Sequence, residues 1–346
     1  MVEQSQKQLP AGVEQALVDL GNSLWTRNFS GTQIKDIVAG LGVLPAQAII
    51  WADAKIADVA GLHQRGISKP SFLARVGLSH RKPPMSGLDL LVNTPDLAPL
   101  FLFHRDGYVR EAALHRYSDP PDNAFFLAAL VYRLNDWAEP VRRAAFRCSE
   151  QLFPRVSPEV VVAAAPFLLG RWRFWGRWEQ KEASLVDAIF EREDVNALLV
   201  ERFLQETKGP LATELRYLLR GRGFDRYLSQ ISRCAVQPSV RAVALKTLIN
   251  GQATWPTGFG RQWIDKRYNL SRRVTVYSRR SLTEQPAIEG SILQGIRDRS
   301  VAVRRVAADA LVANRATFQG LDHAIAELAG DTSPAIRERV NFLSRD

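Results

Sequence analysis

Arginine and aromatic residues are interleaved in one stretch of this 346-residue chain, residues 251–285. Arginine forks suit phosphate and carboxylate oxygens, and aromatic rings stack on bases or on arginine itself. Long inserted segments are often binding loops, and a solvated basic loop pinned down by its aromatic rings would have the same composition. Residues 274–277 are also compatible with a short strand. The candidate partner-binding residues in or just before this stretch are Arg220, Arg222, Arg261, Trp263, Lys266, Arg267, Arg272, Arg273, Arg279 and Arg280.

A second aromatic group, residues 171–178, contains three Trp and one Phe among three Arg. On a helix, Trp172, Trp175 and Trp178 would fall on one broad face. That face either packs into the core or lines a groove on which a base or a peptide stacks. Trp172 and Trp175 are therefore further candidates for partner binding.

Motifs for catalysis or metal binding are not found in the sequence. The five His residues lack metal-ligand spacing, and there is no P-loop, dinucleotide, zinc or nucleophile-elbow motif. Cys148 and Cys234 lie far apart, which favours two buried free thiols. We therefore predict no catalytic residue, no metal and no small-molecule cofactor.

The charge of the chain is unevenly distributed. Lys and Arg number 46 and Asp and Glu 36, which gives a formal net charge of +10. Residues 204–290 hold fifteen of these basic residues and only six of the acidic ones, so nearly the whole surplus lies there. Such a surplus favours an acidic partner, namely nucleic acid, an acidic protein surface or anionic lipid.

The apolar segments do not predict a membrane span. The longest charge-free apolar run, residues 37–52, is interrupted by Gly40, Gly42 and Pro45. A spanning helix needs roughly 20 apolar residues. The N-terminal residues also lack the apolar segment of a secretory signal, so we expect a cytoplasmic protein.

A recurring sequence motif, called the phrase below, covers most of the chain. It consists of a polar or acidic turn, then Val-Arg or Ile-Arg, then small apolar residues at helical spacing. The arginines of its five clear copies are Arg110, Arg142, Arg241, Arg304 and Arg337. Their intervals of 32, 99, 63 and 33 residues fit a period of about 33, with degenerate copies at 158–189 and 194–220 and an insertion at 251–285.

The phrase has a physical meaning as the start of a helix. Pro140, Pro238 and Pro334 stand at the first helical turn, where proline loses no needed hydrogen bond. The Val and the Ala or Leu three or four residues later form one buried stripe. Small residues on that stripe allow neighbouring helices to approach closely.

The phrase resembles the second helix of HEAT repeats, in particular the short bacterial kind related to phycocyanin-lyase repeats. Over residues 95–346 the resemblance implies an all-α fold, a right-handed α-solenoid of HEAT-like repeats. It also implies a structural Asp–Arg ladder between repeats. The implied ladder residues are Asp106, Asp136, Asp298 and Asp331 with Arg110, Arg142, Arg304 and Arg337. Gln237 replaces the Asp in the copy that contains Arg241, which departs from the family pattern.

Residues 1–95 lack the phrase although they have helical periodicity. We expect them to form an N-terminal helical cap or degenerate repeats, because terminal repeats are usually atypical. Residues 96–346 then form the repeat array, with the basic insertion at 251–285.

Three functional hypotheses follow. The first is a non-enzymatic scaffold or adaptor that binds an acidic macromolecular partner through its basic surface. The second is a nucleic-acid-binding protein that uses residues 204–290. The third rests on a general resemblance to HEAT-like alkylpurine DNA glycosylases, which place a carboxylate near aromatic side chains in a basic groove. The nearest such arrangements are Trp175 with Glu179, Trp178 with Glu182, and Asp136 beside Trp137.

Overall fold

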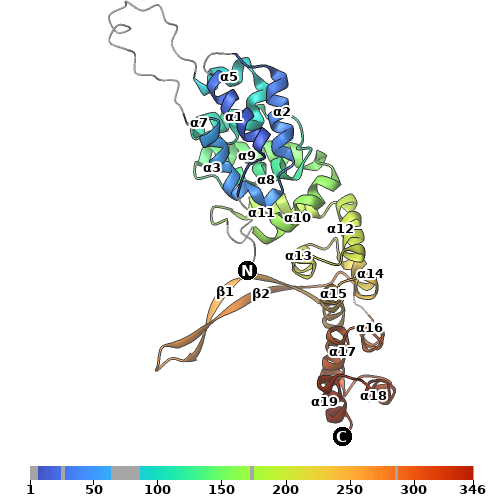
Figure 1. Ribbon diagram of the computed structural model, residues 1–346. Helices are drawn as coiled ribbons and strands as arrows, with labels where there is room; N and C mark the ends of the chain where they lie inside the picture. Colours follow the sequence, from blue (N-terminus) through green and yellow to red (C-terminus); the bar gives the residue numbers. More distant parts are fainter. Residues whose placement is uncertain (1–6, 25–27, 64–85, 172–174, 285–286, 346) are drawn as a thin grey trace, which may run out of the picture. The chain divides into compact units, whose positions relative to one another are not determined.

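The computed structural model describes residues 7–24, 28–63, 86–171, 175–284 and 287–345. Over these residues the protein is mostly helical, with 18 α-helices and one two-stranded hairpin (Figure 1). The all-α expectation is thus wrong at residues 252–281, which form strands. The chain divides into two compact units, Met1–Ile189 and Phe190–Asp346, and the expected division near residue 95 lies inside the first.

In the first unit, helices that are close in sequence pack together. Its α-helices are α1 (Ala11–Leu24), α2 (Gly31–Gly42), α3 (Ile49–Val59), α5 (Gly87–Asn93), α6 (Ala98–Phe101), α7 (Gly107–Arg116), α8 (Ala124–Arg133), α9 (Glu139–Leu152), α10 (Pro158–Arg171) and α11 (Gln180–Phe190). Helices α7 and α8 both contact α9, and α8 also contacts α10. The N-terminal helices α2 and α3 contact α8, where Asp53 pairs with Arg133. The N-terminal segment is therefore packed on the helices that follow it.

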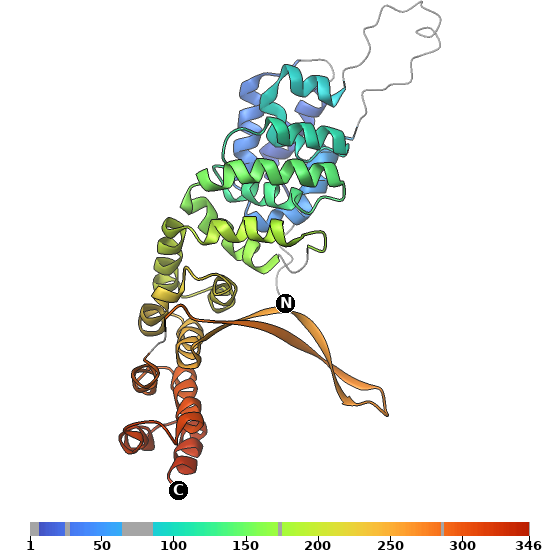
Figure 2. The ribbon, with the colours of Figure 1, turned by 180° about the vertical axis from the view of Figure 1, so that it is seen from behind.

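In its described residues, the second unit consists of eight α-helices and the hairpin. Its elements are α12 (Glu193–Gln205), α13 (Leu211–Leu218), α14 (Leu228–Cys234), α15 (Pro238–Asn250), β1 (Gln252–Asp265), β2 (Leu270–Ser281), α16 (Ile288–Ile296), α17 (Val301–Asn314), α18 (Leu321–Ala329) and α19 (Pro334–Leu343). Helices α13, α15, α17 and α19 contact one another in that order, and each of the last three also contacts the helix before it (Figure 2). Helices also occupy both regions predicted as degenerate copies of the phrase.

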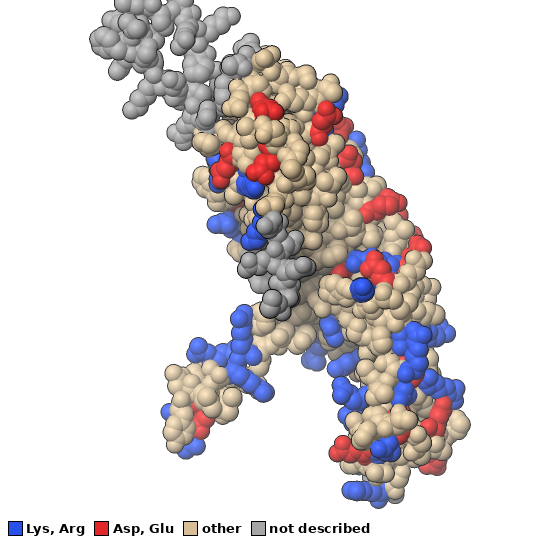
Figure 3. Space-filling view, viewed as in Figure 1, with Lys and Arg blue, Asp and Glu red and all other residues tan. Residues whose placement is uncertain are grey.

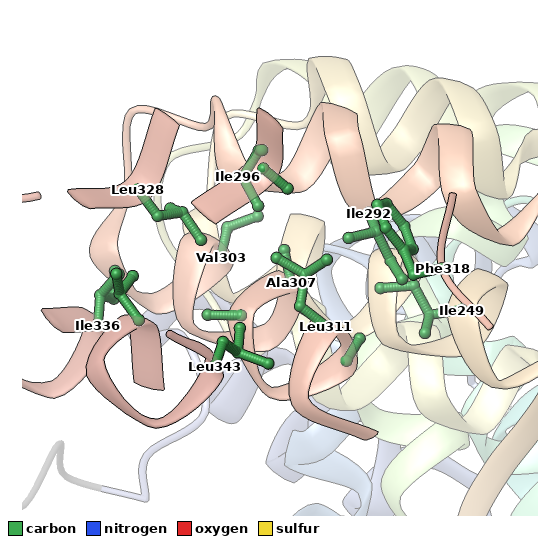
Figure 4. Packing of buried hydrophobic residues seen from close by; sticks show 14 of the residues in the cluster. Ile249, Ile292, Ile296, Val303, Ala307, Leu311, Phe318, Leu328, Ile336 and Leu343 are labelled. Carbon is green, nitrogen blue, oxygen red and sulfur yellow. The ribbon is translucent and has the colours of Figure 1, made fainter. Parts of the chain in front are cut away.

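The apolar stripe of the phrase becomes the core of the second unit. Val303, Ala307 and Leu311 follow one another at intervals of four on α17, and all three are buried. Helix α16 approaches closely because Gly295 has no side chain: a Cβ there would lie 2.8 Å from the Cβ of Ala307. Figure 4 shows this cluster, which includes Ile249, Ile292, Ile296, Phe318, Leu328, Ile336 and Leu343.

A buried arginine joins consecutive helix pairs in the first unit. The Arg110 guanidinium donates to both carboxylate oxygens of Asp136, at 2.9 and 2.8 Å. Its remaining terminal nitrogen donates to the carbonyls of His104 and Arg105, at 2.8 and 3.0 Å. Arg110 is only 3% exposed, so these bonds compensate for a charge that water does not reach.

The same arrangement recurs in the second unit around Arg241. This side chain is 1% exposed and binds both oxygens of Asp298 at 2.8 Å. It also donates to the carbonyls of Ala235 and Val236, at 2.7 and 3.0 Å. Gln237 is therefore not the ladder position, which lies six residues before each arginine, at Ala235 in this copy.

The next step of the ladder pairs Arg304 with Asp331, at 2.6 and 3.1 Å. Arg304 also donates to the carbonyl of Asp298, the carboxylate of which accepts from Arg241. Burial disfavours the charged form of Asp298, but the hydrogen bonds from Arg241 and the Ser300 N–H, together with the charges of Arg241 and Arg299, outweigh it and keep the pKa of Asp298 below its usual value. The carboxylate therefore stays ionised.

Three implied ladder residues have other partners. Arg142 and Arg337 donate to the carbonyls of their own turns, at Asp136 and Asp331, and not to the Asp of a following repeat. Asp106 caps α7 by accepting from the N–H of Tyr108, at 2.9 Å. The ladder prediction is thus confirmed for the pairs Arg110–Asp136 and Arg304–Asp331, whereas Asp298 accepts from Arg241, which was not one of the implied ladder arginines.

We expect Arg241→Ala to lower the free energy of unfolding of the second unit by about 3–5 kcal/mol, because Asp298 loses the charge that compensates it. Urea unfolding, with hydrogen exchange of α15 and α17 to localise the effect, measures this change. The matched control is Arg297→Ala, which removes an exposed ion pair with Glu327 and should change little. Similar losses in the two variants would contradict a special role for the ladder.

His104 occupies the ladder position of the first clear copy, and its Nδ1 accepts from the Asp106 N–H at 3.0 Å. Burial lowers its pKa from 6.5 to about 4, so the folded protein keeps this ring neutral. As the pH falls from 6.5 towards 4 the unfolded chain binds the proton first, and stability declines by up to about 3 kcal/mol. Urea unfolding over this range should show a smaller decline for His104→Asn, and parallel curves would refute this assignment.

Candidate functional site

The predicted insertion is a long antiparallel hairpin that projects from the helices of the second unit (Figure 1). Strands β1 and β2 pair from Gln252↔Ser281 to Asp265↔Leu270, with register irregularities at residues 257 and 264. At the tip, the Asp265 carboxylate accepts from the Arg267 N–H at 2.8 Å, and Asn269 adopts a positive φ of 52°. This turn exposes Lys266 and Arg267 to solvent.

The base of the hairpin is fixed by Arg280. Its guanidinium binds both carboxylate oxygens of Asp225, at 2.9 and 2.6 Å. It also donates to the carbonyls of Leu219, Arg220 and Gly221 at the end of α13. Arg280 thus clamps β2 to the helices, which differs from its predicted role in partner binding.

Two further contacts close the hairpin base. Thr283 donates to Asp225 through both its N–H and its hydroxyl, at 2.9 and 2.8 Å. The Gly251 carbonyl accepts from the Leu282 N–H at 3.0 Å, and Gly251 ends α15 with a φ of 61°, which a residue with a Cβ rarely adopts. The hydrogen bonds to Asp225 outweigh the effect of burial and hold the pKa of that carboxyl below its usual value.

The strand register sorts the hairpin side chains onto two faces. Directly paired residues share a face, and successive residues of β2 alternate between the faces. The pairs Phe259↔Thr275 and Arg261↔Arg273 therefore lie on the same side as Tyr277. We call this side the Arg/aromatic face, and define it by Phe259, Arg261, Trp263, Arg273, Tyr277 and Arg279, all of which are exposed.

Cation–π contacts agree with this assignment. The Arg273 guanidinium lies 3.7 Å from the ring centroid of Phe259 on the neighbouring strand. The Arg261 guanidinium lies 5.2 Å from the ring of Trp263, two residues along the same strand. These contacts restrict both arginines and keep charge and ring surface side by side.

The opposite face has a different composition. It carries Gly260, Val274 and Val276, and a Cβ on Gly260 would lie 3.1 Å from Val276. The Arg272 side chain lies here and donates to the Gln262 amide oxygen at 2.8 Å. Arg272 and Arg273 are therefore adjacent, exposed and on opposite faces. On the side seen in Figure 3, basic side chains gather along the hairpin and over helices of the second unit.

Arg220 and Arg222, which were predicted to bind a partner, lie between α13 and α14, near a cleft at the hairpin base. This cleft has a volume of about 780 Å³, and its lining includes Arg222, Arg226 and Arg233 together with Asp225 and Glu284. The exposed Arg222 is placed there, whereas the half-buried Arg220 donates to the Tyr217 carbonyl at 3.2 Å. Because the cleft holds both signs of charge, it suits a polyanion less well than the hairpin does.

The aromatic group before α11 was predicted as a helical face that either packs into the core or lines a groove, and for Trp175 the structure agrees with packing, although this residue is not in a helix. Trp175 lies in a turn and is 6% exposed. Its ring centroid lies 6.1 Å from that of Phe167 and 4.6 Å from that of Trp178. It is therefore a packing residue and not available to a partner. Trp172 lies outside the described residues.

Two of the three carboxylates considered for glycosylase chemistry are held within the fold, whereas the third, Glu179, is exposed and pairs with Lys181 at 3.4 Å. Glu182 is buried and accepts from the Glu179 N–H at 2.8 Å at the start of α11. Asp136 accepts from Arg110 and Arg133, and the pKa of Asp136 is lowered because these contacts outweigh its burial. Glu182 and Asp136 are therefore fixed by the fold and not presented to a ligand.

A second charged cleft, of about 380 Å³, occurs in the first unit and includes Asp53, Tyr132 and Arg133 in its lining. Burial raises the pKa of Asp53, against the opposing charge of Arg133. The sequence did not indicate this cluster, because its ion pair joins residues 80 positions apart. Its carboxylate is already paired with an arginine that also binds Asp136.

Other features predicted for cysteines, metals and membranes have the following outcomes. Cys148 is buried and its thiol pKa is raised by burial to about 12, whereas Cys234 is exposed, contrary to the prediction. Among the described side chains, no group of three or more His, Cys, Asp or Glu could hold a metal ion. Within the same residues no single helix is long and apolar enough to cross a membrane, and one bent pair, Gly31–Gly42 with Ala46–Val59, meets the criterion only jointly.

Comparisons with known proteins add no family. The chain matches no protein-family model, and a search of curated proteins gives no significant relative. The assignment of the site therefore rests on the hairpin itself.

We expect Arg280→Ala to loosen the hairpin base, because it removes the partners of Asp225 and of three carbonyls. Hydrogen exchange at residues 276–283 should accelerate by about tenfold or more, as for the loss of a charged hydrogen bond. Arg279→Ala, on the Arg/aromatic face, is the neighbouring control and should leave exchange unchanged. Equal acceleration in both variants would show that Arg280 is not the clamp.

Proposed function

We propose that this chain is a HEAT-like helical-repeat protein that binds nucleic acid through the hairpin of its second unit. The observation that carries the proposal is the distribution of charge on the hairpin. Residues 252–281 contain seven basic residues and one acidic residue, Asp265, and six of the seven basic residues are exposed. A projecting element with so large a surplus attracts a polyanion.

The internal ion pairs of the second unit increase this surplus at the surface. Glu214 accepts from Arg202 at 2.8 Å, and Asp225 is bound by Arg280, so both carboxylates are paired with arginines of the helices and hairpin base. On the hairpin, Asp265 is part of the tip turn. Within the part of the chain that the structure describes, the exposed arginines of the two strands form no ion pair with an acidic side chain.

Nucleic acid is favoured over an acidic protein surface because of the aromatic rings. Phe259, Trp263 and Tyr277 are 51%, 40% and 58% exposed on the same face as three arginines. Carboxylate clusters would need the arginines alone, whereas phosphates and bases use both kinds of side chain. The acidic-protein hypothesis is the main competing outcome of the experiment below.

The α-solenoid part of the proposal rests on the second unit and on the ladder. Helices α13, α15, α17 and α19 contact one another in chain order, which is the packing that stacked repeats require. Arg241 and Arg304 each join one pair to the next by the same bidentate geometry. A regular array of this kind provides a firm base for a projecting hairpin.

The experiment is a salt titration of binding to mixed-sequence oligonucleotides, measured by fluorescence anisotropy. We expect the logarithm of the binding constant to fall linearly with the logarithm of salt between about 50 and 200 mM. The triple variant Arg261→Ser, Arg273→Ser, Arg279→Ser should reduce the slope by roughly 2–3, since each phosphate contact contributes about 0.7–0.9.

The control for this titration is a triple variant with the same change in charge in the first unit, Arg143→Ser, Arg147→Ser, Arg155→Ser, at three exposed positions. It should retain the wild-type slope. If no oligonucleotide binds at low salt while an acidic polypeptide such as poly-glutamate does, the proposal is wrong and the acidic-protein hypothesis is correct.

A further inference from the structure

The Arg/aromatic face has an order along the hairpin. From the base towards the tip, the register gives Arg279, then Tyr277, then Phe259, then the pair Arg261 and Arg273, then Trp263. Successive register positions on one face are about 6.8 Å apart. Two adjacent rings, Tyr277 and Phe259, therefore lie between Arg279 and the pair Arg261 and Arg273, Trp263 lies beyond that pair, and no acidic residue lies on this line.

We propose that this face binds a single strand of nucleic acid, with unpaired bases stacked on the aromatic rings and phosphates held by the arginines. The inference rests on the proposed nucleic-acid binding and specifies the state of the bound strand. DNA and RNA share the two chemical groups concerned, the phosphate and the face of the base.

The exposed rings argue for unpaired bases. In a duplex, base faces are stacked on one another, and a protein reaches only phosphates, sugars and base edges. Arginines can use these groups, but the broad faces of Trp263 and Tyr277 cannot. Exposed rings of this size cost solvation free energy unless a partner covers them, and a base face is the partner that matches their shape.

The opposite face of the hairpin supports the same conclusion. At the base of this face Trp255 is half-buried and Arg280 forms the clamp. Further out along the described strands, Gly258, Gly260, Val274 and Val276 offer no ring, and Arg272 is the one cation. The major groove of a duplex is wide enough for a two-stranded β-ribbon. A ribbon inserted there would use the side that faces the bases for polar contacts to base edges. The Arg/aromatic face instead carries aromatic rings between its arginines. Such a surface suits stacking on unpaired bases better than hydrogen bonding to the edges of base pairs.

The binding experiment uses the full chain and four labelled probes in fluorescence anisotropy. The probes are a mixed-sequence DNA single strand, the RNA strand of the same sequence, the corresponding DNA duplex, and an abasic deoxyribose-phosphate strand of equal length. We expect both single strands to bind about a hundredfold tighter than the duplex and the abasic strand, which corresponds to the stacking of two bases at about tenfold each.

Matched substitutions separate stacking from charge. Trp263→Leu and Tyr277→Leu should each weaken single-strand binding by about tenfold and leave abasic-strand binding unchanged. Tyr268→Leu is the control, because Tyr268 lies in the tip turn, 81% exposed and off the Arg/aromatic face. Circular dichroism of each variant verifies that the helices remain folded.

The second matched pair tests the choice of face. Arg273→Ser and Arg272→Ser remove the same charge from adjacent exposed positions on opposite faces. Only the Arg273 substitution should weaken single-strand binding appreciably, since Arg272 points away from the strand.

The outcomes distinguish this inference from the proposed function. If all probes bind equally and the aromatic variants behave as wild type, nucleic-acid binding stands and single-strand stacking is wrong. Tighter binding of the duplex would identify the hairpin as a groove-reading ribbon and overturn the inference. If no probe binds, the proposed function itself fails. Equal losses for Arg272→Ser and Arg273→Ser would overturn the assignment of the face.

Discussion

The bidentate arginine–aspartate pair is the interaction on which the packing of this chain depends. A guanidinium that is 1–3% exposed is tolerated only when its charge and its N–H groups are all matched. Arg110 and Arg241 meet this condition by binding two carbonyls of their own turn and both oxygens of an aspartate in the next helix pair. A displaced helix pair would leave a buried charge unmatched, so the ladder fixes the position of each helix pair relative to the next. The apolar stripe also stabilises the packing, but apolar contacts are not directional and do not fix this position.

The hairpin is attached by the same chemistry. Arg280 binds an aspartate and three carbonyls at a helix end, as the ladder arginines do, and Asp225 accepts from Arg280 and Thr283. Two classes of arginine thus coexist in the basic segment. The buried ones hold the structure together, and the exposed ones of the Arg/aromatic face remain for a partner. The total charge of a segment does not separate these classes, whereas burial and bonding do.

The sequence predicted the helices well because their cause is local. Val303 and Ala307 recur at helical spacing, and Pro238 and Pro334 mark helix starts, as the structure confirms. The hairpin was not predicted, since neither of its faces packs along its length and period-two alternation is therefore not imposed on β2. The pair of Arg241 with Asp298 was missed because the hairpin separates them by 57 residues. The sequence did not show whether Trp175 is buried or exposed, because it is buried by Phe167 and Trp178, which pack against it only in the folded chain.

The two ends of the hairpin lie close together where the chain leaves and rejoins the helices, and this determines how much the hairpin can vary without affecting the helices. The carbonyl of Gly251 and the N–H of Leu282 are hydrogen-bonded, so the thirty residues between them begin and end at nearly one point. The ladder step from Arg241 to Asp298 spans this excursion and remains closed. Changes in the length or side chains of the hairpin beyond the clamp would therefore leave the packing of the helices undisturbed.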